Sequence, residues 1–134
     1  MNTPIDIKKK WYNNVDIFEF IGELDETNAD KTFTAIYNAI GDFTWKRIIF
    51  NLSGLKYLNS KSIGYIADIF SNIEDGNGQM FLTNLTDEVR DTLELVGITT
   101  IITTLNTENE ALLKLGITPA PAQAPAAPQS PAAQ

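Results

Sequence analysis

The chain has 134 residues, a formal net charge of −7 at pH 7 and 43% hydrophobic residues, which is enough for one domain with a single core. It contains no cysteine and no histidine, which excludes disulfides, metal sites built on those residues, and catalysis by a cysteine nucleophile or a histidine base. The acidic balance also argues against nucleic acid as a ligand, because phosphate binding relies on clustered lysine and arginine.

The sequence predicts neither a signal peptide nor a membrane span, since no window approaches the ~18 apolar residues that a span requires. We therefore expect a cytoplasmic protein with no membrane partner. Three lysines occupy residues 8–10, and we interpret them as guarding a solvated edge strand rather than forming a platform for single-stranded nucleic acid with Trp11 and Tyr12. The chain lacks a glycine-rich phosphate cradle, so we expect no nucleotide or other cofactor.

The first residues predict a β-hairpin. Apolar and polar side chains alternate over residues 5–11, and a second apolar run at residues 15–20 follows the turn pair Asn13-Asn14. Alternation on both sides of a short polar turn is typical of two antiparallel strands.

A helix and a central strand are predicted next. Apolar residues at spacings of three and four over residues 26–40 indicate a helix, with Thr27 and Asp30 as a capping pair at its start. Residues 47–52 form a short continuous apolar run, which is typical of a buried strand. We expect a loop over residues 53–58.

The remaining elements alternate between helix and strand. They are predicted as a helix from residue 60 to the turn at residues 76–78, a strand at 80–82, a helix at 86–96, a β-branched strand at 98–103 and a helix at 107–116. The order β-β-α-β-α-β-α-β-α predicts an α/β fold with a mixed, mostly parallel sheet of four to five strands covered by about four helices. Residues 1–117 form this single domain, and residues 118–134, rich in proline and alanine, are expected to be a disordered tail.

The junction between the central strand and the next helix is the place where chemistry is expected. Ser60 lies there, at a helix N-terminus whose free N–H groups and dipole favour a phosphate. The alternative is that Ser60, like Asn59, is simply an N-cap residue. We expect Ser62 to be a solvent-facing helix residue and Tyr57 to be either partly buried or a contact anchor for a partner. Asp25 offers no catalytic pairing with a second carboxylate, so the chain is not expected to be an enzyme.

Three stretches of the sequence resemble the STAS family, and within it the stand-alone anti-sigma factor antagonists. Residues 20–25 read Phe-Ile-Gly-Glu-Leu-Asp, residues 51–60 read Asn-Leu-Ser-Gly-Leu-Lys-Tyr-Leu-Asn-Ser, and residues 108–116 read Glu-Asn-Glu-Ala-Leu-Leu-Lys-Leu-Gly. Each is similar to a family motif, and they occur in the family's order. The resemblance spans about residues 5–117.

The resemblance implies a role for Ser60. Antagonists of this type bind a GHKL-type serine kinase that is also an anti-sigma factor, are phosphorylated on the serine after the signature aspartate, and are reset by a PP2C-type phosphatase. Carried over, the phosphorylated residue is Ser60, and Asp25 lies near it in the partner-binding surface. The chain departs from the signature in having Asn59 for aspartate, Lys61 for the second hydroxyl residue and Ser62 for glycine. Lys61 is then placed to neutralise part of the charge of a phosphate on Ser60.

Two hypotheses follow from the same residues. In the first, the protein is a switch that binds the kinase when unphosphorylated and is released when Ser60 carries a phosphate, with Tyr57, Asn59, Lys61 and Ser62 in the contact surface. In the second, it is a permanent non-catalytic subunit, similar to the STAS component of ABC-type transporters, and Ser60 is never phosphorylated.

Overall fold

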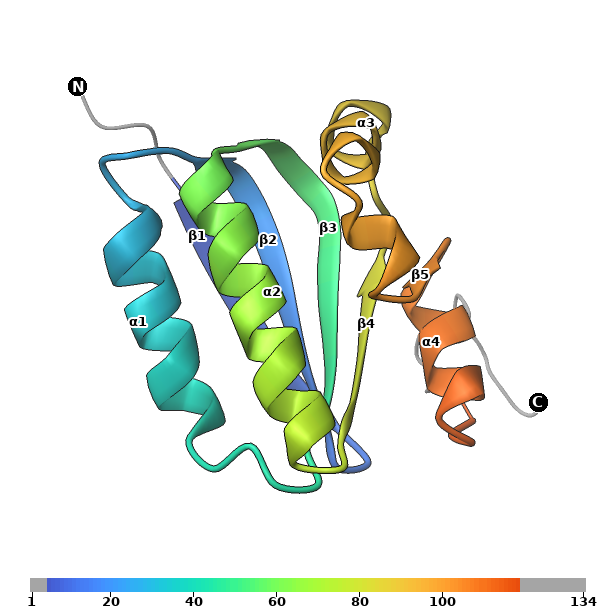
Figure 1. Ribbon diagram of the computed structural model, residues 1–134. Coiled ribbons are helices and arrows are strands. Elements are labelled where there is room, and N and C mark those ends of the chain that lie inside the picture. Colours follow the sequence, from blue (N-terminus) through green and yellow to red (C-terminus); the bar gives the residue numbers. More distant parts are fainter. Residues whose placement is uncertain (1–4, 119–134) are drawn as a thin grey trace.

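The computed structural model describes residues 5–118, so the predicted tail lies outside the described residues except for Thr118. The elements are β1 (Ile5–Tyr12), β2 (Val15–Leu24), α1 (Ala29–Ile40), β3 (Arg47–Leu58), α2 (Ser60–Asp75), β4 (Gln79–Thr83), α3 (Asp87–Leu95), the 3₁₀ turn η1 (Ile98–Thr100), β5 (Thr104–Leu105) and α4 (Glu108–Lys114) (Figure 1). In this part of the chain no helix is both long and apolar enough to cross a membrane.

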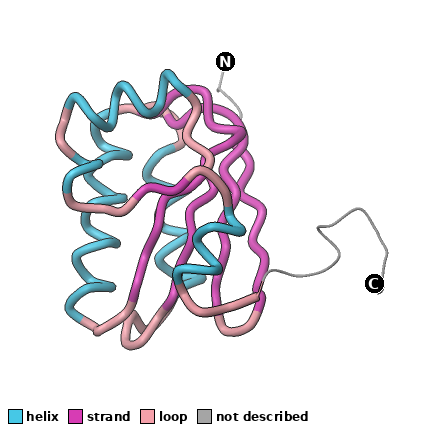
Figure 2. The backbone as a smooth tube through the Cα atoms, turned by 90° about the vertical axis from the view of Figure 1, so that its right-hand side faces the viewer, coloured by secondary structure: helices cyan, strands magenta, loops and turns pink. Residues whose placement is uncertain are grey.

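The strands form one five-stranded sheet in the order β1-β2-β3-β4-β5. β1 pairs with β2 in antiparallel fashion, and the other three pairings are parallel. The prediction of an α/β fold with a mixed, mostly parallel sheet is therefore confirmed. The helices α1 and α2 lie side by side against the sheet, whereas α4 packs near the β5 edge (Figures 1 and 2).

The alternation of side chains along β2 separates two core clusters. Phe18 and Phe20 are buried against the α1 and α2 layer, and the ring of Phe18 meets that of Phe50 edge-on, with centroids 5.7 Å apart. Ile17, on the opposite face, belongs to a smaller cluster with Leu112 of α4. Both faces of the central strands are thus buried, as their apolar runs predicted.

The predicted loop over residues 53–58 is wrong, because β3 continues through it to Leu58. The extra residues pair with the end of β2 through two shifts in register, and Gly54 and Leu55 then lie opposite Ile21 and Gly22. A bulged strand breaks the strict alternation of side chains, which explains why the sequence pattern indicated a loop.

The predicted strand over residues 98–103 is also wrong. Its first half is the turn η1, and β5 has only two residues. Ile98 and Ile102 are both buried, and the amide of Ile102 donates to the carbonyl of Ile98 at 2.9 Å. A spacing of four buries both side chains on one side of a helical turn, so packing overrides the strand propensity of β-branched residues.

The start of α1 differs from the predicted capping pair. The N-cap residue is Asn28, and its side chain does not cap the helix. Thr27 instead bonds to Asp25, and Asp30 bonds to α2. The first turn of α1 is therefore held by contacts with neighbouring segments.

Candidate functional site

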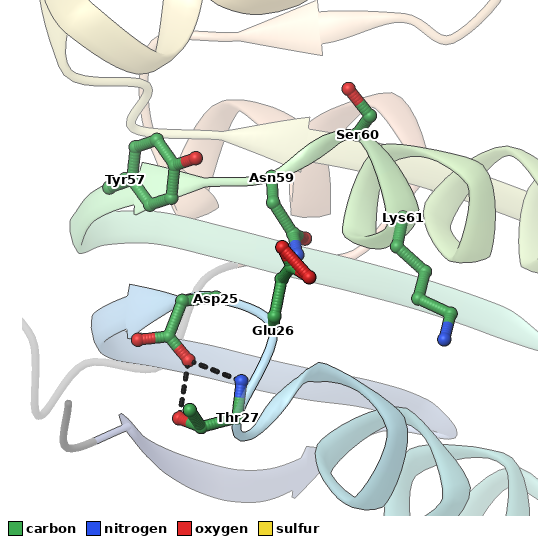
Figure 3. Close-up of a pocket in the computed structure, with 7 residues that line it drawn as sticks. All are labelled: Asp25, Glu26, Thr27, Tyr57, Asn59, Ser60 and Lys61. Atoms are coloured by element: carbon green, nitrogen blue, oxygen red, sulfur yellow. Dashed lines mark hydrogen bonds between the residues drawn. The ribbon is translucent and has the colours of Figure 1, made fainter. Parts of the chain in front are cut away.

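A pocket of about 640 Å³ opens where β2 and β3 end and α2 begins (Figure 3). Seven residues line it: Asp25, Glu26, Thr27, Tyr57, Asn59, Ser60 and Lys61. Five of the six residues predicted to form a site are among them, and Ser62 is not. Glu26 and Thr27 were missed, although they follow Asp25 directly in the chain.

The parallel pairing of β2 with β3 brings the two sides of the pocket together. Glu23 lies opposite Tyr57 and Leu24 opposite Leu58 in the register, and the amide of Asn59 donates to the carbonyl of Leu24 at 3.0 Å. Because parallel strands end at the same edge of a sheet, the residues that follow them become neighbours. Asp25 therefore lies beside the start of α2.

Asn59 is the N-cap residue of α2. Its backbone is extended, and its Oδ1 accepts a hydrogen bond from the amide of Ser62 at 3.0 Å. Ser60 is the first helical residue, and it is exposed. Because Asn59 caps the helix, the Ser60 hydroxyl lies at the helix N-terminus and is not the capping group.

The acid from the end of β2 is fixed by its own loop. Oδ1 of Asp25 accepts hydrogen bonds from the amide and the hydroxyl of Thr27, at 2.9 and 2.6 Å (Figure 3). The amide of Asp25 donates to Oδ1 of Asn28 at 3.0 Å, and the Asn28 side-chain amide donates to the carbonyl of Glu23 at 2.9 Å. These bonds hold the carboxylate in one orientation at the rim of the pocket.

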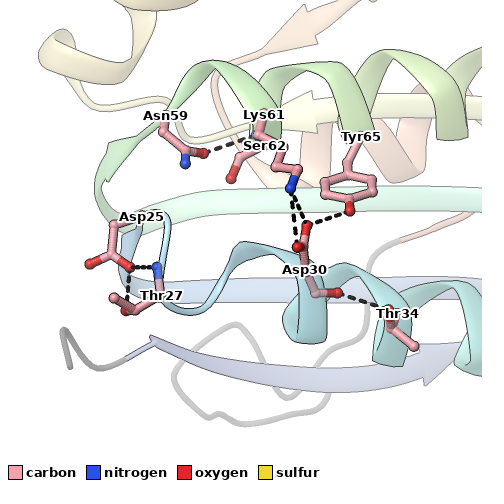
Figure 4. Close-up of polar contacts among 8 residues, drawn as sticks. All are labelled: Asp25, Thr27, Asp30, Thr34, Asn59, Lys61, Ser62 and Tyr65. Carbon is pink, nitrogen blue, oxygen red and sulfur yellow. Dashed lines mark hydrogen bonds and ion pairs between the residues drawn. The ribbon is translucent and has the colours of Figure 1, made fainter.

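Lys61 points away from Ser60 and toward α1 (Figures 3 and 4). Its ammonium lies 3.0 Å from Oδ1 and 3.1 Å from Oδ2 of Asp30, and the hydroxyl of Tyr65 donates to Oδ1 of the same carboxylate at 2.6 Å. The Tyr65 hydroxyl and the Lys61 ammonium hold the pKa of Asp30 below its ordinary value. The bond to Asp30 raises the pKa of Lys61 and that of Tyr65. The charge of Lys61 is thus engaged between the two helices.

Ser62 is buried, and the expectation that it faces solvent is wrong. Its side chain is 0% exposed, and its Oγ has no hydrogen-bond partner in the structure. The buried residues Ile66, Ile69 and Ile73 continue from Ser62 along the same face of α2 at intervals of four, three and four. That spacing is visible in the sequence and would have indicated a core position for Ser62.

The surface of the pocket combines an exposed aromatic ring with two carboxylates. Tyr57 is 51% exposed, which suits an aromatic anchor in an interface. The carboxylates of Asp25 and Glu26 give the rim negative charge. Within residues 5–118 no group of three or more acidic side chains is arranged to hold a metal ion.

Comparisons with known proteins agree on the fold. A family model described as the STAS domain matches residues 6–111. The anti-sigma-B factor antagonist of Listeria monocytogenes is 28% identical over 111 residues, which cover 82% of this chain and 95% of that protein. An anti-sigma factor antagonist from Mycobacterium paratuberculosis has a similar structure, with a TM-score of 0.74, 18% identity, and coverage of 84% of this chain and 95% of that one. The phosphorylated form of SpoIIAA, a cell fate determinant of Bacillus, gives a TM-score of 0.61 at 21% identity and covers 84% and 99% of the two chains.

Proposed function

Because the chain belongs to the STAS domain family, we propose that it is an anti-sigma factor antagonist that binds its partner protein through the pocket around Ser60. Phosphorylation of Ser60 releases the partner. The observation that carries this proposal is the position of Ser60, an exposed residue that begins α2 in a pocket with Asp25 and Tyr57. The Listeria relative supports the class, since its name is that of an anti-sigma factor antagonist.

The charges of the pocket support a clear difference in partner binding between the unmodified and the phosphorylated protein. A phosphate on Ser60 adds about −1.5 to −2 charges at one point. Asp25 and Glu26 line the same pocket, so the added charge increases a negative surface. Lys61 is engaged with Asp30, and neutralising the phosphate would require it to leave that carboxylate. A partner that packs closely over the unmodified Ser60 would have to bury this phosphate without a paired cation from this chain, which is costly and favours release.

The partner in this proposal is a GHKL-type serine kinase that acts as the anti-sigma factor, and a PP2C-type phosphatase removes the phosphate. The helix N-terminus makes Ser60 a favourable phosphate position for the kinase product. The protein itself supplies no catalytic group and acts by occupying the kinase surface.

The proposal is tested with tagged protein expressed in its own cells as wild type, Ser60→Ala and Ser60→Asp. We expect Ser60→Ala to retain a protein with a GHKL ATPase domain in the presence of ATP, and Ser60→Asp to lose it. Peptide mass spectrometry of the wild-type protein, incubated with that purified kinase and ATP, should place one phosphate on Ser60.

Ser71→Asp provides the matched control. Ser71 is exposed on the same helix but far from its start, so the same charge there should leave binding unchanged. Equal binding by Ser60→Ala and Ser60→Asp, with no phosphate on Ser60, would contradict the switch. Stable co-purification with a transporter ATPase, unaffected by either variant, would instead favour the permanent-subunit hypothesis.

A further inference from the structure

The two tryptophans of the chain are both exposed at the end of the sheet opposite Ser60. Trp11 of β1 is 64% exposed, and Trp45, in the turn before β3, is 72% exposed. Both line one surface pocket of about 460 Å³. Two large aromatic side chains on the walls of one open pocket are a typical feature of a binding surface.

Trp45 is held outward by an uncommon backbone conformation. Its φ is +60°, a left-handed conformation that is rare for bulky residues and costs about 1–3 kcal/mol. Its amide donates to the carbonyl of Gly76 at 2.8 Å, which fixes the turn. Trp45 therefore combines a strained backbone in a fixed turn with a largely exposed indole.

Two of the charged groups around the two indoles, Asp16 and Arg47, already have partners. Asp16, 9% exposed, forms an ion pair with Lys9 at 3.2 Å. The guanidinium of Arg47 donates to the carbonyls of Asn13 and Leu115, both at 3.3 Å. Asn14, Thr44 and Lys46 complete the lining, so these walls offer a ligand the faces of two indoles together with N–H and O–H donors. An uncharged ligand rich in rings and carbonyl oxygens fits that chemistry.

The chain contains such a segment after Thr118. Residues 119–134 contain five prolines and no ionisable side chain, and a proline-rich chain in the polyproline II conformation presents carbonyl groups without internal hydrogen bonds. The hydroxyl of Tyr12 donates to the carbonyl of Thr118 at 2.8 Å, so the last described residue is bonded to the residue that follows Trp11 in β1. Because successive side chains of a strand point to opposite faces, Tyr12 and Trp11 lie on opposite faces of the sheet. β1 is an edge strand, so a segment that starts at Tyr12 needs to pass around this one strand to reach Trp11.

The length of the tail is sufficient for this path. Sixteen residues follow Thr118, and at about 3.1 Å per residue they span about 50 Å when extended. Beyond the tryptophan pocket, an apolar groove of about 320 Å³ between β1 and α1 is lined by side chains that include Ile7, Ala35 and Ala39. Ile7 and Trp11 lie on the same face of β1, so the groove continues the surface of the pocket.

We propose that the proline-rich segment 119–134 folds back on its own domain and binds across Trp11 and Trp45. Proline rings pack on the indole faces, and the indole N–H groups donate to carbonyl oxygens of the tail, as in other recognition of polyproline II segments by aromatic grooves. The inference is independent of the proposed role of Ser60, which lies at the other end of the sheet.

Tryptophan fluorescence tests the proposal directly, because both tryptophans belong to the pocket. The full chain is compared with a full-length variant in which prolines 119, 121, 125, 128 and 131 are replaced by glycine, which preserves length and charge. We expect acrylamide to quench the tryptophan fluorescence of the wild type less than that of the variant, because the tail covers the rings. The quenching constant of the wild type should be lower by about a factor of two. Replacing Gln123 and Gln129 by serine, which leaves every proline in place, should preserve the wild-type value.

Equal quenching of the wild type and the proline variant would overturn the proposal. A difference in quenching between the wild type and the proline variant that persists on dilution supports binding within one chain. Protection that appears only at high protein concentration would overturn that arrangement and assign the tail to the pocket of a second copy. Far-ultraviolet circular dichroism of the variants should match the wild type, since the substitutions lie outside the domain.

Discussion

The amide of Asn59 donates to the carbonyl of Leu24 at 3.0 Å, and this bond joins the end of β2 to the start of α2. Asp25 follows one of these residues and Ser60 follows the other, so the bond sets the spacing of the proposed partner surface. The pocket depends on the close approach of β2 and β3 as much as on the residues that line it. Substitutions that separate the two strands should therefore affect the site from a distance.

Gly54→Ala should lower the free energy of unfolding by about 1–3 kcal/mol, because it forces extra volume into a closed space. A Cβ at Gly54 would lie 2.9 Å from the carbonyl oxygen of Phe20 and 3.1 Å from Cα of Ile21. These are backbone atoms of β2, and they can yield only if the strands move apart. Urea denaturation measures the change.

Gly64→Ala is the matched control and should act in the opposite direction. Beyond the adjacent residues and the backbone of its own helix, a Cβ at Gly64 meets no atom within 4 Å, and the residue lies inside α2. Alanine should raise the free energy of unfolding by up to about 1 kcal/mol through its higher helix propensity. If both substitutions changed the free energy of unfolding in the same direction, the close contact at Gly54 would not be the cause of the change there.

Asn59→Ala and Asn59→Asp should have opposite effects on stability. Alanine removes the oxygen that accepts from the amide of Ser62 and should cost about 1 kcal/mol. Aspartate keeps an acceptor and adds a negative charge at the helix N-terminus, which should contribute about 0.5 kcal/mol at low ionic strength. The gain with aspartate should shrink in high salt, whereas the loss with alanine should not. Thermal unfolding at two salt concentrations distinguishes these contributions.

The sequence predicted the order of strands and helices well but not the details of the site. The helix over α2 follows from local periodicity, which a sequence displays directly. Local capping preference left Asn59 and Ser60 as two candidates for its cap, and the structure has Asn59 in that position. The extension of β3 depends on its bulged pairing with β2, and the contact between Lys61 and Asp30 joins two helices. Such contacts are set by packing, and a single sequence contains no local signal for them. The proximity of Asp25 to Ser60 was predicted from the family resemblance, and the structure provides its physical cause.

Asp30→Asn should reduce the loss of stability at acid pH. The pKa of Asp30 is lowered in the folded protein by its contacts with Tyr65 and Lys61. A carboxyl whose folded pKa is depressed stabilises the protein above its unfolded pKa of about 3.9 and loses that contribution as the pH falls through the folded pKa. Between about pH 4.5 and pH 2 the variant should therefore lose less stability than the wild type.

Tyr65→Phe separates the two contacts that hold this carboxylate. It removes the hydrogen bond that lowers the pKa of Asp30 most and leaves Lys61 in place, so its acid loss should lie between those of the wild type and Asp30→Asn. Denaturant unfolding at a series of pH values measures all three proteins. Identical pH dependence of the wild type and Asp30→Asn would show that the exposed contacts contribute nothing measurable, as many surface ion pairs do.

Ser62→Ala should raise the free energy of unfolding by about 1 kcal/mol or more, because it removes a buried hydroxyl that has no hydrogen-bond partner. The substitution leaves the cap intact, since Asn59 accepts from the backbone amide of Ser62 and not from its side chain. Ser71→Ala, at an exposed position of the same helix, measures the contribution of helix propensity alone, about 0.5 kcal/mol. A gain at Ser62 that clearly exceeds the gain at Ser71 identifies the unpaired hydroxyl as the cause, whereas a loss would mean that this hydroxyl has a partner in solution.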